Sequence, residues 1–411
     1  MSLLVLKFGG TSVGDTDRIK NAAAKVAEEV RRGHKVAVVV SAMSGVTDQL
    51  ITYCNTISPH HDRREHDAVV STGEQVTAGL MAMALQQRGL NARSWQGWQL
   101  PLRTDSSHSN ARILSVEGDA LRKRIDTGEI GVMAGFQGVT EDNSVTTLGR
   151  GGSDTSAVAL AIALKADRCD IYTDVNGVYT TDPRIVTKAH KMGRISYEEM
   201  LELASLGAKV LQTRSVELAM RYRMPVQVLS TFANDVGSDF PGTLVTDGDE
   251  TMEQNVVTGI AYTRDAAKIT LVKVSDKPGI AASVFTPLAK AGINVDMIVQ
   301  TAAVDGGATD ITFTVGKGDL ERAQKVLDSE RTTIGYEKLI AAADVTKISL
   351  VGVGMRSHAG VAATMFQTLA EKNINIQVIE TSEINTSVLI AEEYTELALR
   401  ALHTAYDLDV K

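Results

Sequence analysis

Short apolar runs alternate with helical periodicity through the first two-thirds of the chain. Residues 3–6 and Lys35–Val40 are apolar runs of strand length, and residues 18–32 between them carry apolar side chains at the spacing of a helix. The runs are continuous rather than alternating, which is typical of strands covered on both faces in a parallel sheet. The same pattern predicts strands at residues 131–134 and 169–173 and helices at residues 74–87 and 153–164. It therefore predicts an α/β sandwich with a mainly parallel sheet.

The last third of the chain contains an internal repeat. A shift of 81 residues places Gly279 on Gly360 and Asn294 on Asn375, and no gap is needed between these two pairs. Two copies of about 80 residues indicate a pair of small ligand-binding modules rather than a solenoid. Each copy predicts a strand, a glycine turn, a helix and two more strands. The clearest of these segments are residues 268–274, 281–291 and 310–315 in the first copy and residues 347–353, 361–372 and 387–391 in the second.

A polar, turn-rich segment at residues 247–250 separates the two parts. We therefore assign residues 1–246 to a first domain. Residues 247–340 form the first module and residues 341–411 form the second.

Composition and charge exclude several classes of protein. The chain of 411 residues has 42 Lys and Arg against 50 Asp and Glu, a net charge of −8, and 4% aromatic residues. Such a chain has no general attraction for nucleic acid or for an anionic membrane surface. Cys54 and Cys169 form neither a disulfide framework nor a zinc pattern, and no apolar run approaches the roughly 18 residues that span a bilayer. We expect a cytoplasmic protein, and the stretch from His60 to His66 is interpreted as solvated surface rather than a metal site.

Glycine-rich segments follow several of the predicted strands. The first is Lys7-Phe8-Gly9-Gly10-Thr11-Ser12. Glycines at a strand end allow backbone N–H groups to turn toward an anion, and Lys7 adds a positive charge. The spacing differs from that of a P-loop, and a tight turn that merely needs glycine is the alternative.

The second segment, residues 41–48, follows the strand Lys35–Val40. It offers hydroxyl and amide groups at the carboxyl end of a strand, where open α/β sheets bind ligands. The alternative is that Thr47 or Asp48 caps the next helix.

The third segment, residues 149–155, leads into an apolar helix. A helix N-terminus attracts anions, and Arg150 beside it can bind a carboxylate or phosphate with two parallel hydrogen bonds. Asp154 could orient a cationic amine or a metal ion. The alternative is that Ser153 or Asp154 caps the helix.

The fourth segment, residues 172–184, mixes turn residues with acids and an arginine. This composition fits a loop around a charged ligand and Mg²⁺. A β-hairpin that turns at Asn176-Gly177 is the alternative. Farther along, Lys209 could reach a phosphate.

Taken together and in this order, these segments resemble the aspartokinases of the amino-acid kinase family. Ser71-Thr72-Gly73-Glu74 also matches the family, although these residues indicate nothing in isolation. The repeat resembles the tandem ACT domains, which are ferredoxin-like units, that follow the kinase domain in these enzymes. The resemblance covers essentially the whole chain.

The resemblance implies that ATP, with Mg²⁺, phosphorylates the side-chain carboxylate of L-aspartate, the first step toward lysine, threonine and methionine. It implies catalytic roles for Lys7, Glu74 and Asp154. It implies a nucleotide site formed by Lys7, Gly9, Gly10, Ser41, Thr173, Asp174, Tyr179, Arg184 and Lys209. It implies an aspartate site formed by Thr47, Glu74, Arg150, Gly151, Gly152 and Ser153, with Arg150 on the α-carboxylate and Glu74 toward the amine.

The ACT pair implies feedback control by lysine, threonine or both. The family's effector contacts fall on Asp276, Gly279, Asn294, Asp296, Gln300, Asn375 and Thr381. ACT units commonly pair across subunits, so we expect a homo-oligomer or an oligomer of α and β subunits, the latter with a second start near Met252. A plain dimerisation module is the alternative for this region. For the whole chain, the alternatives are another amino-acid kinase or an amino-acid sensor with a silent kinase domain.

Overall fold

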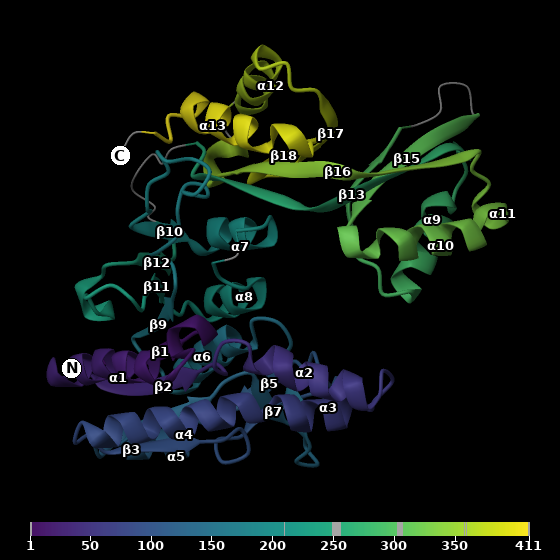
Figure 1. Cartoon of the computed structure of the whole chain (residues 1–411). Helices are drawn as coiled ribbons and strands as arrows, with labels where there is room; N and C mark the ends of the chain where they lie inside the picture. Colours follow the sequence, from purple (N-terminus) through teal and green to yellow (C-terminus); the bar gives the residue numbers. More distant parts are fainter. Residues whose placement is uncertain are drawn as a thin grey trace. The chain divides into compact units, whose positions relative to one another are not determined.

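The computed structural model describes residues 2–208, 210–248, 256–301, 307–356, 358 and 360–409. Lys209 and Met252 lie outside these residues. The described chain divides into two compact units (Figure 1). The first comprises residues 2–178, 191–205 and 210–248. The second comprises residues 179–190, 206–208 and the described residues from 256 onward, so it includes segments that precede the boundary expected near residue 246.

The first unit is built on an eight-stranded sheet of order β10-β12-β11-β9-β1-β2-β6-β3. The strands are β1 (Leu3–Phe8), β2 (Lys35–Val40), β3 (Ala92–Trp95), β6 (Ile130–Ala134), β9 (Arg168–Thr173), β10 (Arg194–Ser196), β11 (Val226–Ser230) and β12 (Thr243–Thr246). The strands from β11 to β3 all run parallel, and β12 lies antiparallel to β11. The prediction of a mainly parallel sheet is confirmed.

The helices of this unit are α1 (Thr16–Arg31), α2 (Val46–Ile57), α3 (Arg63–Val70), α4 (Thr72–Gln87), α5 (Asp119–Asp126), α6 (Gly152–Ala163), α7 (Tyr197–Ser205) and α8 (Thr213–Tyr222). The three helices predicted in this part of the chain are α1, α4 and α6, and their ends agree with the prediction to within two residues. No helix among the described residues is both long and apolar enough to cross a membrane.

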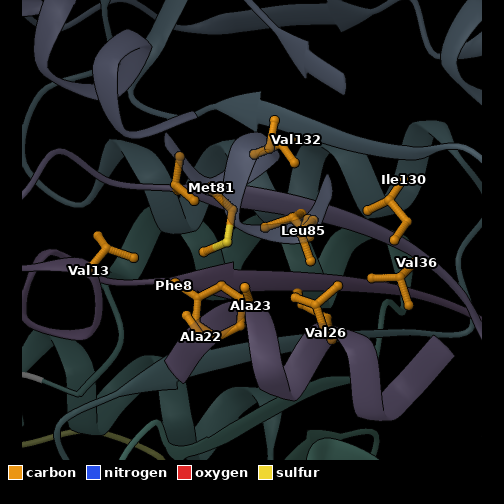
Figure 2. Packing of buried hydrophobic residues seen from close by; sticks show 14 of the residues in the cluster. Phe8, Val13, Ala22, Ala23, Val26, Val36, Met81, Leu85, Ile130 and Val132 are labelled. Atoms are coloured by element: carbon orange, nitrogen blue, oxygen red, sulfur yellow. The ribbon is translucent and has the colours of Figure 1, made fainter. Parts of the chain in front are cut away.

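The core of the first unit lies between the sheet and the helices α1 and α4. Figure 2 shows Met81 and Leu85 of α4 among side chains from the strands and from α1. Phe8, at the end of β1, belongs to the same core. Side chains alternate between the two faces of a strand, so Lys7 points to the other face, which α6 covers. Each fully buried apolar side chain contributes about 1.5–3 kcal/mol to folding.

A second, smaller sheet has the order β5-β4-β7-β8. Its strands are β4 (Leu102–Thr104), β5 (Ile113–Val116), β7 (Gln137–Val139) and β8 (Val145–Thr147). Helix α3 packs against β8. This sheet matters for the site because the chain passes from β8 directly into the loop that carries Arg150 and then into α6.

The second unit contains a six-stranded sheet of order β14-β15-β13-β16-β18-β17. Its strands are β13 (Gly259–Ser275), β14 (Val295–Gln300), β15 (Ala308–Val315), β16 (Lys338–Val351), β17 (Ile376–Thr381) and β18 (Asn385–Ala391). Its main helices are α9 (Ile280–Lys290), α10 (Leu320–Ser329), α12 (Val361–Glu371) and α13 (Thr395–Ala405), with the short α11 (Arg331–Ile334) after α10. The bounds of α9 coincide with those of α12, and the bounds of β14 with those of β17, at the shift of 81 residues found in the sequence. The repeat in the sequence therefore corresponds to a repeat of secondary-structure elements.

The two copies of the repeat share their longest strands. The first part of β13, including Ile260, pairs with the part of β16 that also pairs with β18. Ile260 accordingly lies in the core of the second copy, whereas Ala341 of β16 pairs with Ile269, which lies in the core of the first. Each half of the sheet therefore contains a strand segment from the other copy, which a strictly linear division of the sequence does not predict.

Candidate active site

The predicted strand-end residues of the first unit gather at one edge of its main sheet. Strands β9, β1 and β2 are parallel neighbours, so their carboxyl ends share this edge. Lys7 and Thr173 lie at the ends of β1 and β9, and Ser41 follows β2 with its amide donating to the carbonyl of Phe8 at 3.1 Å. The sheet topology thus brings together segments that are far apart in the sequence.

Lys7 forms a buried ion pair with Asp154. The distance from Lys7 Nζ to Asp154 Oδ1 is 2.5 Å, and both side chains are about one-tenth exposed. Helix α6 begins at Gly152, and its N-cap is Gly151, with no side-chain cap. The alternative that Ser153 or Asp154 merely caps the helix is therefore wrong, since Asp154 in the first turn is directed to the lysine instead.

Gly9 and Gly10 allow the chain to pass very close to its neighbours. A Cβ on Gly9 would lie 3.4 Å from Lys7 Nζ, and one on Gly10 would lie 3.2 Å from the carbonyl oxygen of Ala42. The Gly9 amide donates to the carbonyl of Tyr172 at 3.1 Å, so it joins β1 to β9 in this structure. The Gly9 amide is therefore used to connect the two strands, and the absence of a side chain at Gly9 leaves space around Lys7 Nζ.

Glu74 lies in the first turn of α4 and is almost fully buried. Its Oε1 accepts a hydrogen bond from the amide of Ala42 at 3.0 Å, whereas its buried Oε2 has no hydrogen-bond partner among the described residues. Burial raises the pKa of this carboxyl to about 7, and the hydrogen bond from Ala42 only partly offsets that effect. A buried oxygen without a donor favours a ligand that brings one, such as an ammonium group.

The loop before α6 holds Arg150 between two glycines in the left-handed region. Gly149 has a φ of +75° and Gly151 a φ of +71°, and a side chain at Gly151 would overlap that of Gln212. Arg150 is exposed, whereas Gly152 and Ser153 behind it are buried. The loop therefore presents an arginine beside the N-terminus of α6, a combination that favours anions.

Thr47 lies in the first turn of α2 and is half-buried. The helix begins at Val46, and Gly45, with a φ of +80°, is its N-cap without a side-chain hydrogen bond. The alternative in which Thr47 or Asp48 caps the helix is wrong, so the Thr47 hydroxyl is not committed to that role.

The segment after β9 does not form the alternative hairpin. Strand β9 ends at Thr173, the next strand is β10, and Asn176-Gly177 lies in bends between them. Thr173 Oγ1 donates to the carboxylate of Asp174 at 3.1 Å, and Asp174 is exposed. Tyr179 and Arg184 belong to the second unit, where Arg184 pairs with Asp182. Lys209 lies outside the described residues.

The predicted effector residues all belong to the second unit. Gly279 has a φ of +90° and precedes α9, and Asn294 and Asn375 are exposed at corresponding positions before β14 and β17. Asp296 of β14 lies 2.7 Å from the buried Lys347 Nζ of β16. Gln300 and Thr381 are the last residues of the edge strands β14 and β17, whereas Asp276 directly follows the central strand β13.

The histidines between residues 60 and 66 bond to one another and to the backbone. His61 Nε2 lies 2.9 Å from His66 Nδ1, and His61 Nδ1 lies 2.7 Å from the carbonyl oxygen of Ser58. Across the part of the chain that the structure describes, no cluster of three or more His, Cys, Asp or Glu side chains could hold a metal ion.

A cavity of about 700 Å³ opens beside the turn at residues 105–112. It is lined by Arg63, Asp105, Ser106, Ser107, His108, Asn110 and Arg112. None of these was predicted as a site residue. The cavity adjoins the arginine loop, because Asn110 Oδ1 would lie 2.9 Å from a Cβ on Gly149.

The sequence does not predict two long-range contacts near the site. Ser12 Oγ lies 2.5 Å from Thr231 Oγ1, although 219 residues separate them, and both side chains are fully buried. Gly135, directly after β6, approaches so closely that a Cβ there would lie 3.0 Å from Ser153 Cβ. A glycine directly after a predicted strand was the available signal for Gly135, whereas nothing in the sequence links Ser12 to Thr231.

Comparisons with known proteins identify the family of the chain. Residues 2–230 match the amino acid kinase family, and residues 268–332 and 348–406 each match an ACT domain. The aspartate kinase of Pseudomonas putida is 53% identical over 410 residues, which cover 100% of this chain and 98% of that protein. Aspartokinase 2 of Bacillus subtilis is 47% identical over 409 residues, which cover 99% and 98% of the two chains.

The fold is similar to that of a solved relative with bound ligands. The crystal structure of Escherichia coli aspartokinase III in complex with aspartate and ADP aligns with a TM-score of 0.80 and 27% identity, covering 98% of this chain and 99% of that one. The family matches and the full-length identities show the family directly. The chain belongs to the aspartokinases of the amino acid kinase family, which are kinases that act on the carboxyl group of aspartate.

Proposed function

We propose that this chain transfers the γ-phosphoryl group of ATP to the side-chain carboxylate of L-aspartate, which yields ADP and 4-phospho-L-aspartate. The observation that carries the proposal is the buried pair of Lys7 and Asp154 at the carboxyl edge of the main sheet. The acceptor is already an anion, so the reaction needs no strong general base. Its difficulty is the repulsion between two anions and the charge on the phosphoryl oxygens.

Lys7 would stabilise the transferring phosphoryl group. Asp154 holds its ammonium group at the strand end, so little reorganisation is needed when the substrates bind. The amide of Gly10 and the N-terminus of α6 would add donors around the phosphates. Fixed donors of this kind supply several kcal/mol of barrier lowering.

Aspartate would bind between Arg150 and Glu74. Arg150 would take the α-carboxylate as a bidentate pair, and Glu74 Oε2 would accept a hydrogen bond from the α-ammonium group. The hydroxyls of Thr47 and Ser153 and the amides of Gly151 and Gly152 would complete the site.

The nucleotide would lie along the ends of β1, β2 and β9. Gly9, Ser41, Thr173 and Asp174 would contribute to this site from the first unit. Mg²⁺ usually keeps several waters and is bound by one or two carboxylates together with substrate phosphates. Asp174 fits this role, because its exposed carboxylate lies directly after β9. The ion would neutralise charge on the phosphates.

The second unit would regulate the enzyme by binding lysine, threonine or both at its edge strands. We assign these effectors to the sites around Asn294 and Asn375, and we place the reaction in the cytoplasm as the first step toward lysine, threonine and methionine. Strands β14 and β17 are the outer strands of the sheet, and they expose Ile298 and Ile379. Open edges with apolar side chains favour pairing with another subunit, so we propose an oligomer.

An assay of ADP release with L-aspartate, L-glutamate or no acceptor tests the reaction. We expect release with aspartate only, together with an acyl phosphate that hydroxylamine traps. Equal release without an acceptor, or a preference for glutamate, would refute the proposed substrate. The same assay over a matrix of lysine and threonine concentrations tests regulation.

A further inference from the structure

Asp67 is a fully buried carboxylate that no part of the proposed reaction uses. It lies on α3, and its two oxygens accept hydrogen bonds from the backbone and hydroxyl groups of Ser109 and Thr147. Thr147 Oγ1 lies 2.7 Å from Oδ1, Thr147 N lies 3.0 Å from Oδ2, and Ser109 N lies 2.9 Å from Oδ2. His108 Nδ1 lies 3.0 Å from Oδ2 as well. These donors replace the hydration that the carboxylate loses on burial.

Of the residues that bond to Asp67, Thr147 and Ser109 lie beside the loop that carries Arg150. Thr147 is the last residue of β8, so only Leu148 and Gly149 separate it from Arg150. Ser109 belongs to the turn before β5, and the next residue, Asn110, contacts Gly149 closely enough to leave no space for a Cβ. Asp67 therefore links the end of β8 to the turn at Ser109. The loop that carries Arg150 lies beside both.

Arg214 of α8 fixes the adjoining backbone. Its guanidinium donates to the carbonyl of Leu148 at 2.6 Å and to that of Ala111 at 2.9 Å. The amide of Ala111 in turn donates to the carbonyl of Thr147 at 2.9 Å. The two residues directly before Gly149 are thus held by side chains from two different helices, whereas Arg150 itself is exposed.

We propose that Asp67 is a positioning residue for aspartate binding, because it fixes through Thr147 and Ser109 the strand end from which Arg150 projects. The inference rests on the proposed function, which assigns the α-carboxylate of aspartate to Arg150. A loop that must be ordered on binding lowers affinity, whereas a preorganised arginine does not incur that cost. Asp67 touches no substrate and acts only through the backbone of β8 and the turn.

Steady-state kinetics of Asp67→Asn, Thr147→Val and Thr147→Ser test the role. Asp67→Asn places an NH₂ group opposite the N–H donors that now bond to the carboxylate. Thr147→Val removes one hydroxyl donor with little change of shape. The valine variant therefore still tests the role if Asp67→Asn folds poorly. We expect KM for aspartate to rise about tenfold in Asp67→Asn and about threefold in Thr147→Val, with KM for ATP changed by less than about twofold. Thr147→Ser should restore the wild-type KM for aspartate.

Glu29 offers a matched control in the same unit. It is also fully buried and accepts a hydrogen bond from the amide of Ser238 at 2.9 Å, at the end of α1. Glu29→Gln should lower stability without a selective change in KM for aspartate. Equal effects of Asp67→Asn and Glu29→Gln on both KM values would overturn the positioning role.

A double-mutant cycle with Arg150→Ala separates this inference from the proposed function. If Arg150→Ala leaves KM for aspartate unchanged, both the proposed aspartate site and the positioning role are refuted. If Arg150→Ala raises KM and Asp67→Asn adds nothing further to it, Asp67 acts through Arg150. Independent, additive effects of the two changes would refute the positioning role alone.

Discussion

Lys7 Nζ and Asp154 Oδ1 lie 2.5 Å apart, one at the end of β1 and the other in the first turn of α6. The pair forms because β1 places Lys7 on the face of the sheet that α6 covers, whereas Phe8 turns into the core on the opposite face. In the proposed reaction this buried lysine meets the phosphoryl group, and the carboxylate of Asp154 compensates its charge until the substrates bind. This pair is the centre of the proposed phosphoryl-transfer site.

Lys7→Ala should lower kcat by about 10² or more, with a smaller change in KM for aspartate, because the lysine acts mainly on the transition state. Steady-state kinetics with both substrates measures this. Lys35→Ala is the matched control, since Lys35 pairs with Asp126 at 2.6 Å at the start of β2, away from the carboxyl ends. A Lys7 variant with nearly wild-type turnover would refute the assigned role.

The pH dependence of aspartate binding should follow Glu74. Its pKa is raised to about 7 by burial, so the free enzyme loses the carboxylate charge as the pH falls through about 7. We expect kcat/KM for aspartate to fall about tenfold per pH unit below that value, since the α-ammonium group then meets a neutral partner. Glu74→Gln should remove this inflection and lower kcat/KM at pH 8. An unchanged profile in the variant would contradict the role.

The same group should make stability depend on pH in a defined direction. A folded-state pKa of about 7, against an ordinary value of 4.5, means that the folded state binds the proton more tightly than the unfolded state. The contribution of Glu74 to the free energy of unfolding therefore falls as the pH rises from about 4.5 to 7. Over that interval the free energy of unfolding of Glu74→Gln should rise by about 1–3 kcal/mol relative to that of the wild type. Chemical denaturation at pH 5 and pH 8 measures the difference. A gap between the two proteins that stays constant with pH would contradict the raised pKa.

Gly151→Ala should impair aspartate binding more than the same substitution at another glycine with a positive φ. The residue has a φ of +71° and its Cβ would overlap the Gln212 side chain, so both strain and displacement of the loop are expected. Gly89→Ala is the matched control, with a φ of +77° and open space around the added carbon. The control should cost about 1 kcal/mol of stability with unchanged kinetics. Gly151→Ala should also raise KM for aspartate, and identical behaviour of the two variants would contradict the proposed loop.

Asn294→Ala and Asn375→Ala should each weaken feedback inhibition, because the two residues occupy corresponding positions before the edge strands β14 and β17. We expect the half-inhibitory concentration of the active effector to rise about tenfold, with kcat changed by less than about twofold. Inhibition curves with lysine, threonine and both together measure this. Gln367→Ala, on the exposed side of α12, is the control. Unaltered inhibition in both asparagine variants would place the effector elsewhere.

The fold was predictable where the chain repeats one simple pattern. The continuous apolar run of β2 and the helical spacing of α1 and α4 fix the layers of the first unit, and the 81-residue shift identifies the two copies in the second. Strands β4, β7 and β8 were not predictable, since three residues carry too little alternation to be recognised. The exchange of strand segments between β13 and β16 depends on register and leaves no local signal.

The sequence indicates the segments of the candidate site, but not the contacts among its residues. Lys7, Arg150 and Asp154 stand out because glycines accompany them at strand and helix ends. Asp67 has no such neighbours, and only the folded chain shows that it holds Thr147. Likewise, Thr180 and His403 lie 2.9 Å apart within the second unit although 223 residues separate them, and this is one of the contacts that join residues 179–190 to that unit.

A crystal structure of the chain with ADP and L-aspartate would locate both ligands. We expect the α-carboxylate of aspartate on Arg150, its ammonium group on Glu74 Oε2, and the phosphates of ADP at the ends of β1 and β9 beside Lys7. Well-defined ligands bound away from this edge of the sheet would contradict this expectation.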